Sequence, residues 1–343
     1  MTSSEIIKQF ILSFNNKDDE AFIKAAREYI ERERRKKHNI VVKELEKALY
    51  DSTSTASFVS ERRFKNAPPI PRDTEKGFPL LEIKNFEYSW DNLILTRNTK
   101  GQLEQVLREF KDADILATYN LDYKKKILLC GNPGTGKTFS TQIVSSTLNI
   151  PMVYVRFDAI ISSYLGETAS NLRKVFDYIE NGAWIVLFDE FDIIGKNRDD
   201  IHEHGEIKRV VNNFLQMLDN FSGNSIIFAA TNHQHMLDSA IWRRFDEVIY
   251  YELPDKKIRL ELFDLYLRPI KREKNIKSKE LAGKTGGLSP SDIKMIAEEA
   301  MKLTILDSRS NVSKADLLFA IKKFKQREKI KQATTQGDNN GTV

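Results

Sequence analysis

A glycine-rich segment of the sequence has the residue types and spacing of a phosphate-binding loop. It follows an apolar run that predicts a strand and precedes a segment that predicts a helix. Glycines let backbone N–H groups wrap a phosphate, a helix start favours negative charge, lysine reaches the β and γ phosphates, and threonine can ligate Mg²⁺. The sequence therefore predicts a site for ATP and Mg²⁺ formed by Gly131, Asn132, Pro133, Gly134, Thr135, Gly136, Lys137 and Thr138.

Two adjacent carboxylates, Asp189 and Glu190, end a later apolar run. Because adjacent side chains on a strand point in opposite directions, the two acids can take separate roles. We expect Asp189 to hold the Mg²⁺ shell and Glu190 to polarise the attacking water as a general base. A strand that ends in solvated acids would give the same pattern, and the upstream phosphate-binding loop is what favours the catalytic interpretation.

Three further polar residues could complete this chemistry. Asn232 follows another apolar run, and its amide could donate to the γ-phosphate and orient the water beside Glu190, although a loop asparagine fits equally well. Arg243 and Arg244 carry paired guanidinium groups suited to the phosphate charge of a transition state. Within one subunit these arginines would stand across the sheet from the phosphate-binding loop. Action on ATP therefore requires a neighbour's site and predicts a head-to-tail ring.

The elements that must position these residues follow an alternating pattern. Apolar runs too short for helices alternate with longer helical segments, which predicts an α/β fold with a parallel sheet covered by helices on both faces. After Pro254 the pattern predicts helices only, in a small lid. The expected strands span residues 126–130, 152–157, 184–188, 225–231 and 248–251.

The remainder of the chain divides by composition. The first residues place apolar side chains at helical spacing, and the following stretch is rich in Ser, Thr and Pro, which resist regular structure. We expect a helical N-terminal module (1–50), a linker (51–80), an α/β nucleotide-binding domain (81–253), a helical lid (254–325) and a flexible tail (326–343).

Composition limits the function classes. The formal net charge of +5 arises from 54 basic residues mixed among 49 acidic ones, which is weak evidence for a nucleic-acid partner, and such a partner is not expected. Cys130 is the single cysteine and cannot form an internal disulfide, and the first residues lack a signal-peptide pattern, so a cytoplasmic location is expected. No apolar run approaches about 20 residues, and integral membrane association is therefore not expected.

The set of motifs, in this order and spacing, resembles the AAA family of P-loop ATPases over residues 81–325. The adjacent arginines followed by phenylalanine are similar to the katanin and spastin branch. The resemblance implies a Walker A motif, a Walker B motif, a sensor and trans-acting arginine fingers, which fall at residues 131–138, at Asp189 and Glu190, at Asn232, and at Arg243 and Arg244.

The same resemblance implies roles for two further segments. Family members place backbone against adenine at the positions of Asp91 and Asn92. Residues 286–293 resemble the lid motif near the nucleotide. This segment lacks the arginine that clamp loaders and replication initiators carry there, which argues against those relatives.

A candidate substrate loop precedes the helix expected to start near Thr168. Tyr164 and Leu165, followed by glycine, occupy the place of the family's first pore loop. An aromatic and an aliphatic side chain repeated around a ring could grip a polypeptide through flat apolar contacts that tolerate any side-chain sequence. From the residues alone, a tyrosine packed under its own helix is slightly favoured, and the resemblance favours the pore.

Three functional interpretations stay open. The favoured one is a hexameric ring that hydrolyses ATP and unfolds a protein substrate by pulling it past Tyr164. Some bacterial relatives are paired with subtilisin-like proteases, so a serine protease is a candidate partner. One alternative is a nucleic-acid motor or loader, supported by the basic residues 32–37 and 322–331. The other is an ATP-driven switch that regulates a partner protein such as a protease.

Overall fold

The computed structural model describes most of the chain after residue 68 and short stretches before it. The chain forms two compact units, Met1–Pro68 and Pro69–Val343. In the first unit the described residues are helical and include the buried Ala25 and Ile30, while the rest of the expected module and residues 51–68 of the expected linker lie outside the described part. The described residues are 8, 12–13, 25–26, 28–32, 34, 69–74, 76–157, 160, 167–191, 204–237, 239–273, 276 and 278–337.

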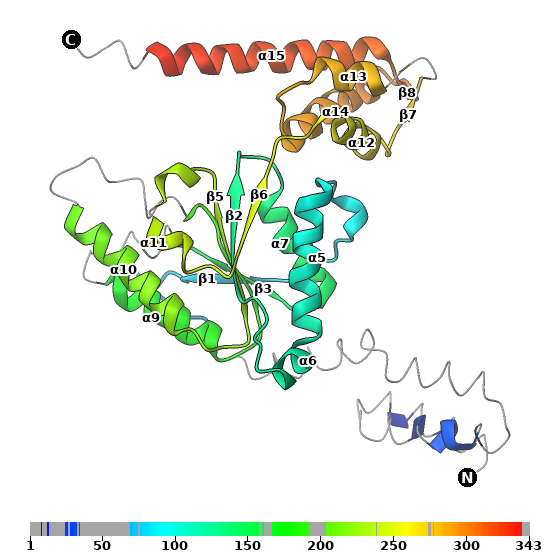
Figure 1. Cartoon of the computed structure of the whole chain (residues 1–343). Helices are drawn as coiled ribbons and strands as arrows, with labels where there is room; N and C mark the ends of the chain where they lie inside the picture. Colours follow the sequence, from blue (N-terminus) through cyan, green and yellow to red (C-terminus); the bar gives the residue numbers. More distant parts are fainter. Residues whose placement is uncertain are drawn as a thin grey trace. The chain divides into compact units, whose positions relative to one another are not determined.

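Among the described residues of the second unit, six strands form one sheet (Figure 1). The order is β1-β3-β4-β5-β2-β6, and every neighbouring pair is parallel except β1 and β3. This arrangement confirms the expected α/β fold. The strands are β1 (Leu81–Lys84), β2 (Lys126–Gly131), β3 (Met152–Val155), β4 (Ile185–Phe188), β5 (Ile226–Thr231) and β6 (Glu247–Tyr251).

The central strands are predictable because helices cover both sides of the sheet, so their side chains are buried continuously rather than alternately. Every residue of β4 and of β5 is buried. The strands expected at 152–157 and 184–188 are shorter in the structure, since β3 ends at Val155 and β4 begins at Ile185. The sequence pattern does not predict β1, because Leu81 alone among its residues is fully buried and the strand lies antiparallel at the sheet edge.

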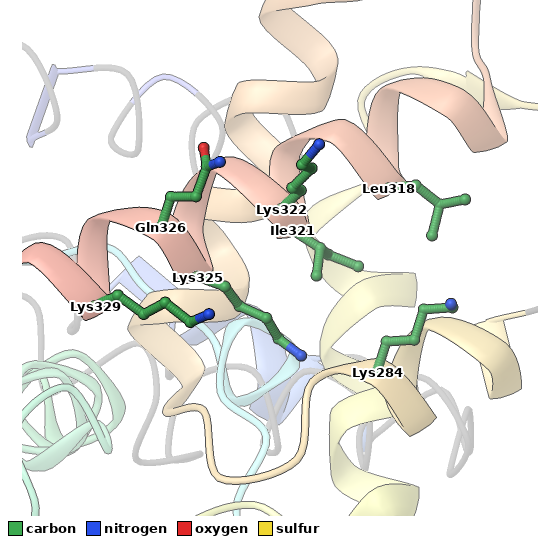
Figure 2. Close-up of a pocket in the computed structure, with 7 residues that line it drawn as sticks. All are labelled: Lys284, Leu318, Ile321, Lys322, Lys325, Gln326 and Lys329. Atoms are coloured by element: carbon green, nitrogen blue, oxygen red, sulfur yellow. The ribbon is translucent and has the colours of Figure 1, made fainter.

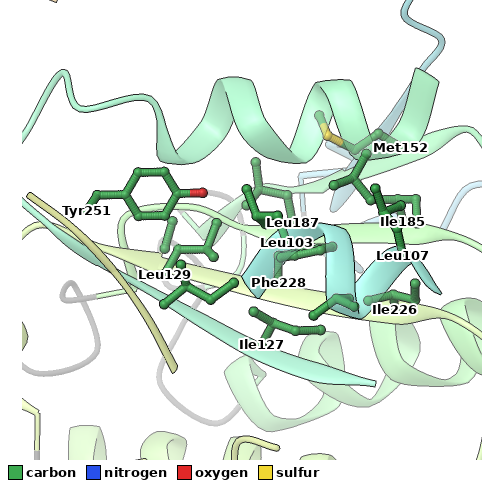
Figure 3. Close-up of a cluster of buried hydrophobic side chains, with 14 residues drawn as sticks. Leu103, Leu107, Ile127, Leu129, Met152, Ile185, Leu187, Ile226, Phe228 and Tyr251 are labelled. Carbon is green, nitrogen blue, oxygen red and sulfur yellow. The ribbon is translucent and has the colours of Figure 1, made fainter. Parts of the chain in front are cut away.

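Helices cover both faces of the sheet (Figure 1). On one face, α5 (Arg97–Lys111) and α7 (Lys137–Leu148) pack on a core that Figure 3 shows, in which Leu103 and Leu107 of α5 meet Leu129 and Phe228 of the sheet. On the other face lie α9 (Thr168–Glu180) and α10 (His204–Asn220), which contact each other. The short helices are η1 (Trp90–Asn92), α6 (Ala113–Thr118), η3 (Gln234–Met236) and α11 (Ser239–Trp242).

The second face is filled with aromatic rings. Phe176 of α9, Phe188 of β4 and Phe214 of α10 have ring centroids between 5.2 and 5.8 Å apart. Ring pairs at this spacing attract each other in addition to the area that they bury. The carboxyl end of β4, where the predicted catalytic acids begin, is therefore anchored to both helices of this face.

The C-terminal part, called the lid here, has its own core and consists of α12 (Lys256–Tyr266), α13 (Ser278–Lys284), α14 (Pro290–Leu306) and α15 (Lys314–Gly337). The expectation of helices only is wrong in one detail, because β7 (Lys271–Arg272) and β8 (Asn311–Val312) form a small parallel pair. Two-residue strands are too short to leave a periodic pattern.

Helix α15 also extends further than the expected boundary at residue 325. It continues to Gly337, so residues 326–337 of the expected flexible tail are helical. Lysine, arginine, glutamine, glutamate and alanine dominate this stretch, and all of them are good helix formers. Among the described residues, no helix has both the length and the apolar character required to span a membrane.

Candidate functional site

The phosphate-binding loop joins the end of β2 to the start of α7. Gly131, Gly134 and Gly136 all have positive φ angles, of 142°, 74° and 105°. A Cβ atom on Gly131 would lie 2.3 Å from the carbonyl oxygen of Tyr251, which no side chain tolerates. Gly136 caps α7 and provides no side-chain hydrogen bond to its first turn. The N–H groups of that turn are therefore suited to an anionic ligand.

Lys137 is the first residue of α7 and is buried, with 6% of its surface exposed. Its Nζ atom donates to the carbonyl oxygens of Gly131 and Asn132, at 2.7 and 2.9 Å, and to Oδ1 of Asn232 at 2.8 Å. Strands β2 and β5 are parallel neighbours, with Cys130 opposite Thr231, so the residues after them meet at one sheet edge. The structure thus brings the predicted lysine and sensor asparagine into contact.

Thr138 and Asp189 form the candidate metal site. The Thr138 hydroxyl donates to Oδ2 of Asp189 at 2.7 Å. An octahedral Mg²⁺ ion with ligands at about 2.1 Å places neighbouring ligand oxygens about 3.0 Å apart. The two oxygens therefore lie close enough to take adjacent positions around Mg²⁺, and their role as its ligands stays a prediction.

The backbone at Glu190 differs from the extended strand that the sequence predicts there. Strand β4 ends at Phe188, so alternation along a strand does not separate the two acids. Instead, Glu190 has a left-handed backbone with φ of 52°, and its N–H donates to Oδ1 of Asp189 at 2.9 Å. A non-glycine residue in this region costs about 1 kcal/mol or more and persists where its surroundings impose it. The neighbouring Phe191 holds the chain in place here, because it is fully buried and its ring centroid lies 5.0 Å from that of Phe214.

The candidate adenine segment and the lid both contact the phosphate-binding loop. Asp91 and Asn92 lie in η1, where Asn92 Oδ1 accepts from the Ser89 N–H at 3.0 Å. A Cβ on Gly136 would lie 3.6 Å from a methyl carbon of Leu93, the next residue. The predicted adenine segment is therefore adjacent to the loop.

From the lid, the Ser291 N–H at the start of α14 donates to the carbonyl oxygen of Gly134 at 3.1 Å. Ser289 and Asp292 cap the same helix reciprocally. Sequence reasoning assigned no role to these individual residues. The pattern Ser-x-x-Asp before an apolar run is the signal that predicts such a cap.

The two predicted arginine fingers have different surroundings. Arg244 follows α11, and its Nε atom donates to Oδ2 of Asp219 on α10 at 3.0 Å. Arg243 is exposed and forms no ion pair within the part of the chain that the structure describes. Sequence reasoning missed Asp219, which no motif marks. Tyr164 and Leu165 lie outside the described residues, although α9 begins at Thr168 as expected.

Comparisons with known proteins agree with this geometry. Residues 127–253 match the family model described as "ATPase family associated with various cellular activities (AAA)". An uncharacterized AAA family ATPase of Sinorhizobium fredii is 32% identical over 322 residues, which cover 92% of this chain and 93% of that protein.

Two archaeal relatives are matched over a shorter part of their length. Proteasome-activating nucleotidases of Saccharolobus solfataricus and Saccharolobus islandicus are 36% and 35% identical over 264 and 245 residues. These matches cover 73% and 67% of this chain, but 65% and 62% of those proteins. The family model, the near full-length relative and the phosphate-binding loop all point to one conclusion: the chain belongs to the AAA family of ATPases and hydrolyses ATP.

Proposed function

We propose that the chain assembles head to tail into a closed hexameric ring in which Arg243 and Arg244 complete the ATP site of a neighbour. The observation that supports this is the register of β6 against β2, where Glu247 lies opposite Ile127 and Tyr251 opposite Gly131. The four residue steps from Glu247 to Tyr251 span about 13 Å. Both arginines precede Glu247, so they lie at the opposite end of the strands from their own phosphate-binding loop. A head-to-tail contact would place them beside the phosphate-binding loop of a neighbouring subunit.

Within each site, hydrolysis needs a water oxygen to attack the γ-phosphorus while the bond to the leaving ADP oxygen breaks. Lys137 and the N–H groups at the start of α7 bind the phosphates. Thr138 and Asp189 would hold Mg²⁺, which neutralises charge on the β and γ phosphates. The Glu190 carboxylate accepts a proton from the attacking water, and Asn232 orients that water. The neighbour's arginines balance the charge that develops on the transferring group.

The work performed by the ring is the unfolding of a protein substrate. Relatives with 35–36% identity are named proteasome-activating nucleotidases, which supports a polypeptide as the substrate. Tyr164 and Leu165 are the residues proposed to grip it. A separate serine protease is proposed as the acceptor of the unfolded chain, because this sequence carries no evident proteolytic motif of its own. The single cysteine, buried and free, supports a cytoplasmic location.

Replacement of Tyr164 tests the substrate assignment. Tyr164→Ala should retain basal ATP hydrolysis within about twofold but lose the ATP-dependent unfolding of a folded fluorescent reporter, because the apolar grip is removed while the site is intact. Loss of fluorescence and phosphate release are measured in the same reaction. Tyr119→Ala, which removes a tyrosine that is 75% exposed on another surface, is the matched control.

Normal unfolding by Tyr164→Ala would refute the pore assignment. If wild-type protein hydrolyses ATP but unfolds nothing, and DNA stimulates its hydrolysis, the nucleic-acid motor would replace the present proposal.

A further inference from the structure

A basic groove lies on the lid between α15 and the end of α13 (Figure 2). Its volume is about 410 Å³. Lys322, Lys325 and Lys329 of α15 and Lys284 of α13 line it. Residues at these intervals on α15 share one face of the helix, together with the aliphatic Leu318 and Ile321, which also line the groove. The groove therefore combines several positive charges with an apolar surface.

Among the described residues, no carboxylate forms an ion pair that neutralises the charges of this groove. Elsewhere on the lid, Lys314 pairs with Glu280 at 2.8 Å and Lys323 pairs with Glu299. The four groove lysines form no ion pair with any residue that the structure describes. Clustered charges of one sign create a potential that attracts the opposite sign. The surface is therefore complementary to an acidic ligand.

The lining favours an acidic peptide over a single-stranded nucleic acid. Proteins that bind single strands stack the bases on aromatic side chains, and none of the lining residues is aromatic. Aliphatic side chains that line a groove instead favour contact with another apolar side chain. From Leu318 to Lys329 the helix rises by about 16 Å, which is the length of about five extended residues.

We propose that this groove docks an acidic segment of a partner protein that carries a bulky aliphatic side chain between its carboxylates. Lysines at the rim bind the carboxylates, and the half-buried Leu318 contacts the aliphatic group above the buried Ile321. The groove is made by the lid helices alone and does not include the nucleotide site. The proposal thus goes beyond ring assembly and substrate pulling, and binding can be measured independently of both.

The test measures binding of short fluorescein-labelled peptides to the full-length protein by fluorescence anisotropy at about 50 mM salt, where screening is weak. One peptide alternates glutamate with leucine, a second has each leucine replaced by serine, and an oligothymidine of equal charge is the third probe. Wild-type protein should bind the leucine peptide at least about fivefold more tightly than the serine peptide. Lys322→Glu/Lys325→Glu should weaken binding of the leucine peptide by about tenfold or more.

Two variants distinguish binding in the groove from a general attraction of the peptides to the positive charge of the lid. Leu318→Ser should remove the preference for the leucine peptide and leave binding of the serine peptide unchanged. Lys257→Glu/Lys302→Glu reverses two other exposed lysines of the lid and should leave all binding unchanged. Basal ATP hydrolysis of each variant reports that the protein is folded.

Several results would overturn the proposal. Equal affinity for the leucine and serine peptides would show that the apolar lining plays no part. Equal weakening by the control double variant would show that the attraction is not local. Tighter binding of the oligothymidine, lost in Lys322→Glu/Lys325→Glu, would assign the surface to nucleic acid. A shift of that variant to smaller assemblies would assign the groove to contact with a second copy of the chain.

Discussion

At the scale of single residues, the candidate site brings together side chains from three distant segments. Lys137 contacts Asn232, and Thr138 contacts Asp189, although these residues come from α7 and from the ends of β5 and β4. Parallel strands end at one edge of a sheet, so motifs far apart in sequence converge there. Because different segments provide the residues, single substitutions should impair ATP binding and ATP hydrolysis separately.

Glu190→Gln and Lys137→Ala should fail at different steps. Lys137→Ala removes the cation that binds the phosphates, and its affinity for a fluorescent ATP analogue should fall by about a hundredfold. Glu190→Gln should bind that analogue normally but hydrolyse ATP about 10²–10⁴-fold more slowly, because the amide cannot accept the water's proton. Equilibrium titration and phosphate release measure the two steps.

The exposed Glu87 provides the matched control, since Glu87→Gln makes the same chemical change outside the site. Normal turnover by Glu190→Gln would show that the general base is misassigned.

At the scale of elements, the sequence predicts the strands that are buried on both faces. It misses the features that depend on contacts between segments far apart in the chain. The runs that form β2, β4 and β5 are almost entirely apolar because both faces of each strand are covered, and this signal is local. Strand β1 is half-buried and exists through pairing with β3 far along the chain. The left-handed Glu190 and the Asp219–Arg244 ion pair also depend on packing between elements, which no residue pattern encodes.

The start of α15 also depends on contacts between residues apart in sequence, and these contacts should make the stability of the fold depend on pH. Asp316 accepts from both terminal nitrogens of Arg309, at 2.6 and 2.8 Å, and caps the helix with Ser313. Hydrogen bonds from the Arg309 guanidinium hold the pKa of the Asp316 carboxyl well below its usual range. A carboxylate with a depressed folded-state pKa stabilises the fold above its unfolded pKa of about 3.9, and that contribution is lost as pH falls further.

Asp316→Asn should therefore lower the thermal unfolding midpoint by about 3 °C at pH 7, and the difference from wild type should shrink below about pH 4. Differential scanning calorimetry over a pH series measures this. Asp307→Asn removes the exposed acid on the other side of Arg309 and should have a smaller effect at every pH. A difference that is independent of pH would mean that the charge of Asp316 is not what stabilises the helix.

At the scale of the whole molecule, the proposed trans action of the arginines would make ATP hydrolysis a property of pairs of subunits. Arg244→Ala leaves a subunit with an intact phosphate-binding loop, and Lys137→Ala leaves a subunit with intact arginines. Each variant alone should be nearly inactive. In an equal, random mixture about one quarter of the sites should regain both parts, since half of the subunits offer the loop and half of their neighbours offer the arginines.

The activity of the mixture therefore distinguishes trans from cis action. It should rise to about one quarter of the wild-type rate as phosphate release is followed after mixing. A mixture of Arg244→Ala with Lys137→Ala/Arg244→Ala offers no intact pair and should stay inactive. If the first mixture also stays inactive, the arginines do not act between subunits.

The Arg244–Asp219 ion pair bears on how easily Arg244 could reach the ATP site of a neighbouring subunit. Both side chains are more than a third exposed, and pairs of this kind contribute about 1 kcal/mol or less. Within one chain, Arg244 therefore pairs with a carboxylate that it can leave at little cost. If Arg244 acts on a neighbour's ATP as proposed, engagement of that neighbour would exchange one anion, the Asp219 carboxylate, for another, the phosphate. The low cost of leaving Asp219 would then let the proposed contacts around the ring form and break at each turnover.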